Sequence, residues 1–283
     1  MLLKKLRILI ITLFELLNRV SLDAPLVVLV WQEIISIDLN INPTLNQKVV
    51  LLLAIWLAYS ADRYLECFGQ RSGLKLHSRH IFYLKNQKSF LMIWVIILLI
   101  SVQLSMNSFS SFQIITGWSV VVLAIGNQTF SYFESSGTKK IFSKKNRTSL
   151  LLSLACIYLP FSLGILLECL SILIFLFFLF WLNCTQINLW ENANDMKKCN
   201  LSDHFFSIHK KNYFIIFCLL IFHGVFLHLL SAGLTFVCLS SITVLAVHYC
   251  INRISLNFDY KRVVLDQCYW ISPIIFVVIN YAQ

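Results

Sequence analysis

The feature that most constrains this chain is a series of apolar segments about as long as a lipid bilayer is thick. A helix needs about 20 mostly apolar residues to cross a hydrocarbon core of roughly 30 Å. Nine segments of the 283-residue chain approach or reach that length, and they lie near 24–40, 48–66, 89–106, 112–133, 148–167, 169–190, 212–230, 232–251 and 263–281. The apolar stretch 148–190 is too long for one crossing, so it is divided where Pro160, Gly164 and Glu168 interrupt it. The sequence therefore predicts an all-α, polytopic membrane protein with nine transmembrane helices.

The composition supports this prediction. Hydrophobic residues make up 58% of the chain and charged residues 13%, with a mean hydropathy of +0.77, which is more apolar than a soluble domain. The connecting segments leave no room for a separately folded domain, so residues 1–283 are expected to form one membrane domain, with the nine helices in 24–281. Residues 1–20 resemble a signal peptide, but Glu15 and Arg19 interrupt their apolar part. We therefore expect an amphipathic helix in the membrane interface there.

The positions of the basic residues predict the orientation, because Lys and Arg are retained on the cytoplasmic side of a membrane. With the N-terminus inside, the cytoplasmic segments collect every Lys and Arg except Lys48. We therefore expect a bacterial inner (cytoplasmic) membrane protein with its N-terminus in the cytoplasm and its C-terminus on the outer side. The net charge of +10 follows from this asymmetry and from attraction to anionic lipid. The lipid bilayer is thus an expected partner, and nucleic acid is not.

Two pairs of acidic residues lie at the predicted cytoplasmic ends of the second and sixth helices. Asp62 and Glu66 are four residues apart, as are Glu191 and Asp195, so each pair shares one face of its helix. Four clustered carboxylates repel one another unless a cation joins them, and carboxylates together with substrate phosphates are the usual ligands of Mg²⁺. Nearby basic side chains suit a diphosphate. The pattern predicts a site for Mg²⁺ and an isoprenoid diphosphate beneath an apolar cavity.

Nine helices with acidic elements after the second and the sixth resemble the UbiA superfamily of intramembrane prenyltransferases, over nearly the whole chain. The segments "SLDAPLVVLVWQ", "AYSADRYLE", "HSRH" and "LNCTQINLWE" look like a divergent bacterial UbiA-like branch. The family's first motif resembles NDxxDxxxD; when its last two acids are aligned on Asp62 and Glu66, Ala58 and Tyr59 stand where Asn and Asp would be. The second motif is reduced to Glu191 and Asp195.

This resemblance implies a UbiA-like bundle and a Mg²⁺-dependent transfer of a polyprenyl group from an isoprenoid diphosphate to an aromatic or other lipid-soluble acceptor. It assigns metal binding and catalysis to Asp62, Glu66, Glu191 and Asp195. Neutralisation of the departing diphosphate falls to Arg63, Arg71, Lys139 and Lys140. Aromatic side chains that would face the allylic cation are Tyr59, Tyr132, Phe133 and Trp190. Asp23 and Asn188 would either support the residues that bind the metal and substrate or orient the acceptor.

Two alternatives remain beside this prediction. In a non-catalytic relative, the acids would be salt-bridged to local Lys or Arg, and the fold would bind lipid or pigment as a subunit of a membrane complex. A transporter is less favoured, because it would need helices broken at mid-membrane, and the chain has only 8 Gly and 4 Pro. Within the sixth helix, Asn183 and Gln186 would either bond to a neighbouring helix or line a cavity.

Overall fold

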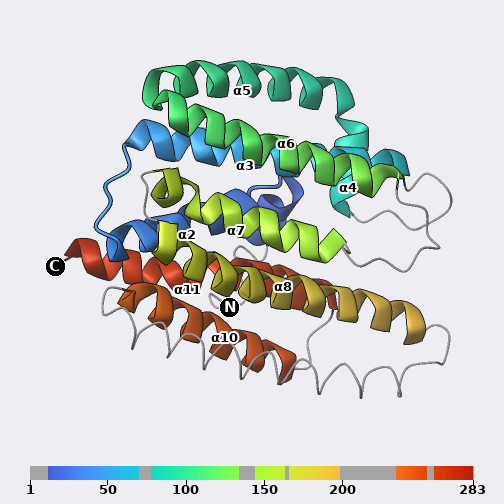
Figure 1. Ribbon diagram of the computed structural model, residues 1–283. Helices are drawn as coiled ribbons and strands as arrows, with labels where there is room; N and C mark the ends of the chain where they lie inside the picture. The colour runs from blue at the N-terminus through green and yellow to red at the C-terminus, as the bar shows by residue number, and fades with distance from the viewer. Residues whose placement is uncertain are drawn as a thin grey trace. The chain divides into compact units, whose positions relative to one another are not determined.

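The computed structural model describes residues 12–69, 78–133, 144–162, 166–197, 234–253 and 258–282, and for some helix residues it describes the backbone alone. All regular secondary structure in these ranges is helical, which confirms the all-α prediction. After a helical segment Thr12–Arg19 come α2 (Asp23–Asp38), α3 (Leu45–Gly69), α4 (Ser78–Lys85), α5 (Gln87–Ser108), α6 (Ser111–Phe133), α7 (Lys144–Ser162), α8 (Leu166–Lys197), α10 (Thr235–Arg253) and α11 (Phe258–Ala282) (Figure 1).

Most predicted segments coincide with these helices. The division of the stretch 148–190 is confirmed, because α7 ends at Ser162 and α8 begins at Leu166. The predicted segment 212–230 lies outside the described residues. The short helix α4 falls in a stretch that the sequence analysis treated as a loop, since eight residues are too few to show a clear helical periodicity.

Within the described residues, three helical stretches are long and apolar enough to cross a membrane: Gln87–Ser108, Cys169–Asn188 and Lys261–Ala282. A fourth is added if Thr12–Arg19 and Asp23–Asp38, which meet at an angle of 94°, count as one bent span. These helices support the prediction that the chain is a membrane protein. A nine-span UbiA-like bundle stays a prediction.

Two helix starts carry the same reciprocal cap. At α3, the backbone N–H of Gln47 donates to the Thr44 hydroxyl, and the Thr44 N–H donates to the Gln47 side chain, at 3.3 and 3.0 Å. At α6, Ser110 and Gln113 repeat this arrangement. Such capping boxes satisfy backbone donors that the first turn of a helix leaves free. They fix where both helices begin.

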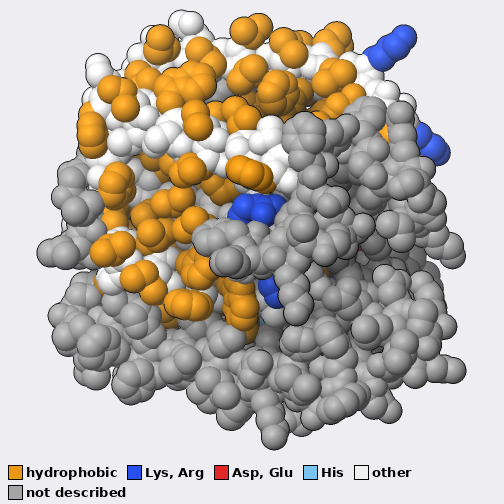
Figure 2. Space-filling model, turned by 45° about the vertical axis from the view of Figure 1, so that its right-hand side comes forward, with side chains coloured by type: hydrophobic (Ala, Val, Ile, Leu, Met, Phe, Trp, Pro, Cys, Tyr) orange, Lys and Arg blue, Asp and Glu red, His pale blue; other side chains and the backbone are white. Residues whose placement is uncertain are grey.

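The chain forms two compact units, which we call unit 1 (residues 1–29 and 43–144) and unit 2 (residues 30–42 and 145–283). The expectation of a single domain stays a prediction. In unit 1, α3 contacts α4, α5 and α6. Large apolar side chains cover the outer surfaces of α5 and α6, for example Leu99 and Val122, and Figure 2 shows hydrophobic groups gathered there. This surface suits contact with lipid.

In unit 2, α11 contacts both α8 and α10, and the core contains fully buried aromatic side chains. Pro273 lies inside α11 and has no N–H, so it cannot bond to the carbonyl of Tyr269 four residues earlier. The Trp31 indole N–H of α2 donates to that same carbonyl at 2.9 Å. A residue far away in the sequence therefore satisfies the backbone group that the proline frees.

Candidate functional site

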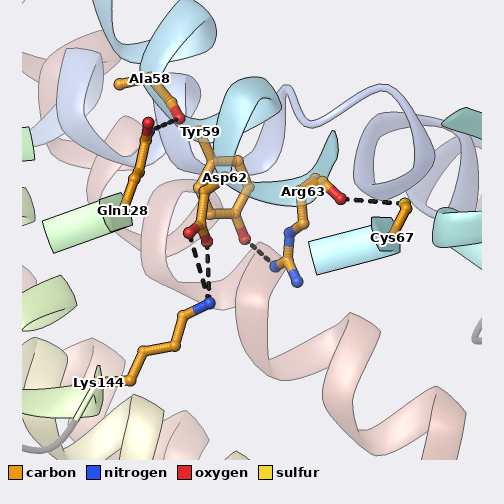
Figure 3. A network of polar contacts seen from close by, with 7 residues as sticks. All are labelled: Ala58, Tyr59, Asp62, Arg63, Cys67, Gln128 and Lys144. Atoms are coloured by element: carbon orange, nitrogen blue, oxygen red, sulfur yellow. Dashed lines mark hydrogen bonds and ion pairs between the residues drawn. The ribbon is translucent and has the colours of Figure 1, made fainter. Parts of the chain in front are cut away.

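Asp62, one of the two acids at the end of the second predicted helix, forms an ion pair with Lys144. Asp62, in the last third of α3, accepts from the Lys144 ammonium group at 3.2 and 3.4 Å, one contact to each carboxylate oxygen (Figure 3). The Asp62 side chain is 17% exposed and that of Lys144 37%. A partly exposed pair of this kind contributes little to stability, at most about 1 kcal/mol. Lys144 therefore holds the Asp62 carboxylate only weakly.

Tyr59 and Arg63 form a second polar contact beside Asp62. The Arg63 guanidinium donates to the Tyr59 hydroxyl and also lies 4.7 Å from the centre of the Tyr59 ring. Since residues 59, 62 and 63 lie three and four apart, they share one side of α3. Figure 3 shows the phenol, the carboxylate and the guanidinium gathered on that side of the helix. The surface offers one anion, one fixed cation and an aromatic face within one helical turn.

Neighbouring helices fix this part of α3 through its backbone. Gln128 of α6 donates to the Ala58 carbonyl at 2.7 Å, and the Trp94 indole of α5 donates to the Leu57 carbonyl at 3.1 Å. Next to these contacts, Cys67, Tyr83 and Phe90 form a buried cluster joined by partly buried aromatic side chains. The helix that carries Asp62 is thus anchored on two sides.

The segment "SLDAP" connects to this cluster. Ser21 has a left-handed backbone, with φ of 60°, in the turn between Thr12–Arg19 and α2, where the Leu22 N–H bonds to the Leu17 carbonyl at 2.9 Å. Its buried hydroxyl hydrogen-bonds to that of Tyr83 at 2.6 Å. Burial raises the pKa of Tyr83, although this hydrogen bond and the charge of Arg63 oppose the shift. Tyr83 therefore stays a neutral phenol that ties α4 to this turn.

Asp23 is almost fully buried at the start of α2 and accepts from the Asn18 side chain at 3.0 Å. Asn18 lies in the helical segment before the turn. This contact braces the bend between the two helices. A role for Asp23 in orienting an acceptor stays a prediction.

The other predicted site residues divide into those that the structure describes and those that it does not. Glu66, Glu191, Asp195, Tyr132 and Phe133 lie on helices, but their side chains are outside the described part. Arg71, Lys139 and Lys140 lie outside the described residues altogether. The backbone of α8 is helical to Lys197, so Glu191 and Asp195 lie four apart on one continuous helix, as the spacing predicts.

Two predicted residues of α8 are described in unit 2. The Trp190 ring lies 5.8 Å from the Lys261 ammonium group of α11, a cation–π contact. Asn188 is exposed. Trp190 therefore faces a protein cation, and its role toward an allylic cation stays a prediction.

No group of three or more His, Cys, Asp or Glu side chains that could hold a metal occurs among the described residues. Three of the four predicted ligands have side chains outside that part, so this finding bears on Asp62 alone. As a hard oxygen donor, Asp62 fits Mg²⁺. The prediction of a Mg²⁺ site remains open for test.

Sequence reasoning missed two residues of the site. Lys144 appeared only as one of several basic residues in a loop, and Tyr83 was not singled out. A sequence signal existed for Lys144, because it comes shortly before the apolar segment 148–167, on the side of the membrane predicted for Asp62. Nothing in the local sequence pairs Tyr83 with Ser21, which lies 62 residues earlier.

Comparisons with family models, with curated proteins and with solved structures find no match for this chain.

Proposed function

We propose that this protein is a UbiA-like prenyltransferase in which Asp62 binds Mg²⁺ and an isoprenoid diphosphate, whose polyprenyl group is transferred to a lipid-soluble acceptor. The observation that carries the proposal is the ionic site on α3 of unit 1, where a carboxylate has Lys144, Arg63 and Tyr59 around it. Ionisable groups on such helices are costly and generally mark functional sites. The resemblance in "AYSADRYLE" concerns the same residues.

The ion pair suits exchange with substrate. Asp62 would hold the Mg²⁺ of a bound metal diphosphate, and Lys144 would then pair with phosphate oxygens. The exchange costs little, because a partly exposed ion pair contributes at most about 1 kcal/mol. Mg²⁺ would supply charge neutralisation of the departing diphosphate. Arg63 provides a fixed cation, and the Tyr59 ring provides a face that attracts positive charge.

A second function is favoured by the same ion pair. Lys144 already balances the charge of Asp62, as expected of a non-catalytic relative that binds lipid or pigment within a membrane complex. The two functions differ in what the pair does. In the enzyme it is replaced on substrate binding, whereas in the non-catalytic relative it is purely structural.

Binding of farnesyl and geranylgeranyl diphosphate to the purified full-length protein, with Mg²⁺ and with EDTA, separates the two. For the enzyme we expect Mg²⁺-dependent binding that is reduced at least tenfold by Asp62→Asn and also weakened by Lys144→Met. Glu15→Gln is the matched control, because Glu15 forms an exposed ion pair with Arg19 at 3.2 Å within the helical segment Thr12–Arg19. Absence of diphosphate binding by a folded wild-type protein would reject the enzyme.

A further inference from the structure

One side of α8 is apolar and exposed. Three large side chains, each four residues from the next, have exposed fractions between 44% and 53%: Leu170, Ile174 and Phe178. Residues at this spacing share one side of a helix, and Trp181 continues the same row three residues later. The opposite side of α8 packs against α11, where the Leu179 carbonyl accepts from the Tyr269 hydroxyl at 3.2 Å. The row therefore faces away from α11.

A lysine lies at one end of this row. The Lys145 ammonium group of α7 is 5.5 Å from the centre of the Trp181 ring, which is a cation–π contact. The Asn146 side chain holds the ring in place, because its oxygen accepts from the Trp181 indole N–H at 2.9 Å. At 1.5 Å per residue, the row from Leu170 to Trp181 is about 16 Å long, roughly half of a hydrocarbon core. A cation thus lies at the end of an apolar row about as long as one lipid leaflet is thick.

The charge of Lys145 is not balanced by an acid among the described residues. Its neighbour Lys144 pairs with Asp62, whereas the described part of the chain contains no ion pair of Lys145. The first turn of α7 has no acidic residue. Trp181 belongs to the apolar stretch Cys169–Asn188, so the cation lies beside a candidate membrane span, where a charge without a counter-ion is costly. A bound anion would remove this cost.

We propose that this side of α8 and the start of α7 bind one anionic phospholipid, such as phosphatidylglycerol. Its phosphate accepts from the Lys145 ammonium group, and one acyl chain lies along Leu170, Ile174 and Phe178. Tryptophan and lysine are typical of the level of the lipid head groups, and lysine attracts anionic ones. A free anion would neutralise Lys145 but leave the apolar row uncovered, so the two features together favour a lipid. The site lies in unit 2 and does not depend on the proposed function.

The test uses two lipids that differ only in the head group. Phosphatidylglycerol and phosphatidylcholine, each with the same diazirine-bearing acyl chain, are added as minor components to phosphatidylcholine nanodiscs that contain the full-length protein. After illumination, the labelled residues are mapped by mass spectrometry. We expect labelling within residues 170–178 to be about fivefold stronger with phosphatidylglycerol, the ratio that corresponds to about 1 kcal/mol for one lysine near an anionic head group.

Four variants locate this preference. Lys145→Gln should bring the ratio to about one, and Lys145→Arg should keep it, because an arginine retains the charge and stacks on the Trp181 ring. Lys88→Gln is the matched control and should also keep the ratio, since it removes the same charge from an exposed position in the first turn of α5. Lys145→Met replaces the Gln variant if that variant fails to fold, as judged by circular dichroism.

Three results would overturn the inference. The first is equal labelling of residues 170–178 by the two lipids in the wild-type protein. The second is a ratio that survives the loss of the charge at Lys145, or that falls equally with Lys88→Gln. The third is the absence of labelling by either lipid, which would show that another occupant, such as a second copy of the chain, covers the row.

Discussion

Unit 1 and unit 2 differ in whether a charged pair stands among their contacts between helices. In unit 1 one such contact is a charged pair, Asp62 with Lys144, which is partly exposed. In unit 2 the contacts of Asp38, Trp31 and Asn183 are hydrogen bonds that are buried or partly buried and join helices distant in sequence. An exposed ion pair is easily exchanged, whereas a buried hydrogen bond is costly to break. We infer that unit 1 carries the exchangeable site and that unit 2 depends on polar contacts for its assembly.

The largest loss of stability is expected when Asp38 is replaced. Its carboxylate accepts from the backbone N–H groups of Phe236 and Val237 at 3.0 and 2.7 Å, and so caps α10 from 199 residues away. Asp38→Ala should lower the free energy of unfolding by about 2–3 kcal/mol, because it leaves two buried donors without partners. Reversible unfolding in mixed micelles, titrated with SDS, measures this. Asp38→Asn should recover part of the loss, and an Ala variant as stable as the wild type would contradict the role of Asp38 as a cap.

The next effect is expected at Trp31. Trp31→Phe leaves the Tyr269 carbonyl without its donor and should cost about 2 kcal/mol in the same assay. Pro273→Ala provides the control, because an alanine N–H at position 273 can bond to that carbonyl within α11. The double variant should therefore be less destabilised than the sum of the single variants. Strict additivity would show that the indole N–H and Pro273 are not coupled.

A smaller effect in unit 1 should follow from Tyr83→Phe, at about 1 kcal/mol, since it removes the hydrogen bond to Ser21. The pH dependence gives a second readout. Because burial raises the pKa of Tyr83 above its usual 10.0, the stability that depends on a neutral Tyr83 is fully present below pH 10 and is lost as the pH rises through the raised value. Unfolding followed between pH 9 and 11.5 should show that loss in the wild type. A Phe variant with the same alkaline loss would assign it to another group.

The smallest effect on stability is expected at the ion pair. Asp62→Asn and Lys144→Met should each change the free energy of unfolding by less than about 1 kcal/mol, because the pair is partly exposed. The same variants should strongly reduce diphosphate binding. If these variants instead lost much stability and bound diphosphate as well as the wild type, the pair would have a structural role and no role in binding.

Apolar length was enough to predict most of the described helices, because about 20 apolar residues in a row have few alternatives to a helix in a membrane. It also located the break between α7 and α8, where Pro160 comes just before the end of α7. The short helix α4 was not predicted. It is held by Tyr83 in a buried cluster, and such a tertiary contact leaves no periodic pattern in the sequence.

The candidate site was predictable only in part. Asp62 stood out because an acid at the end of an apolar segment is costly, and the same reasoning would have singled out Asp266 of α11, which accepts from the Asn183 side chain of α8. The partners of these acids were not predictable. Lys144 and Asn183 meet them from helices 82 and 83 residues away, and one sequence contains no record of which helices become neighbours.

The two longest-range contacts of α2 have a consequence for biosynthesis. Asp38 and Trp31 leave the ribosome early, but their backbone partners are made about 200 residues later, in α10 and α11. Until α10 and α11 have been synthesised, the Asp38 carboxylate and the Trp31 indole N–H lack these backbone contacts. A chain that stops short of α10 would therefore lose the hydrogen bonds that join α2 to the last two described helices.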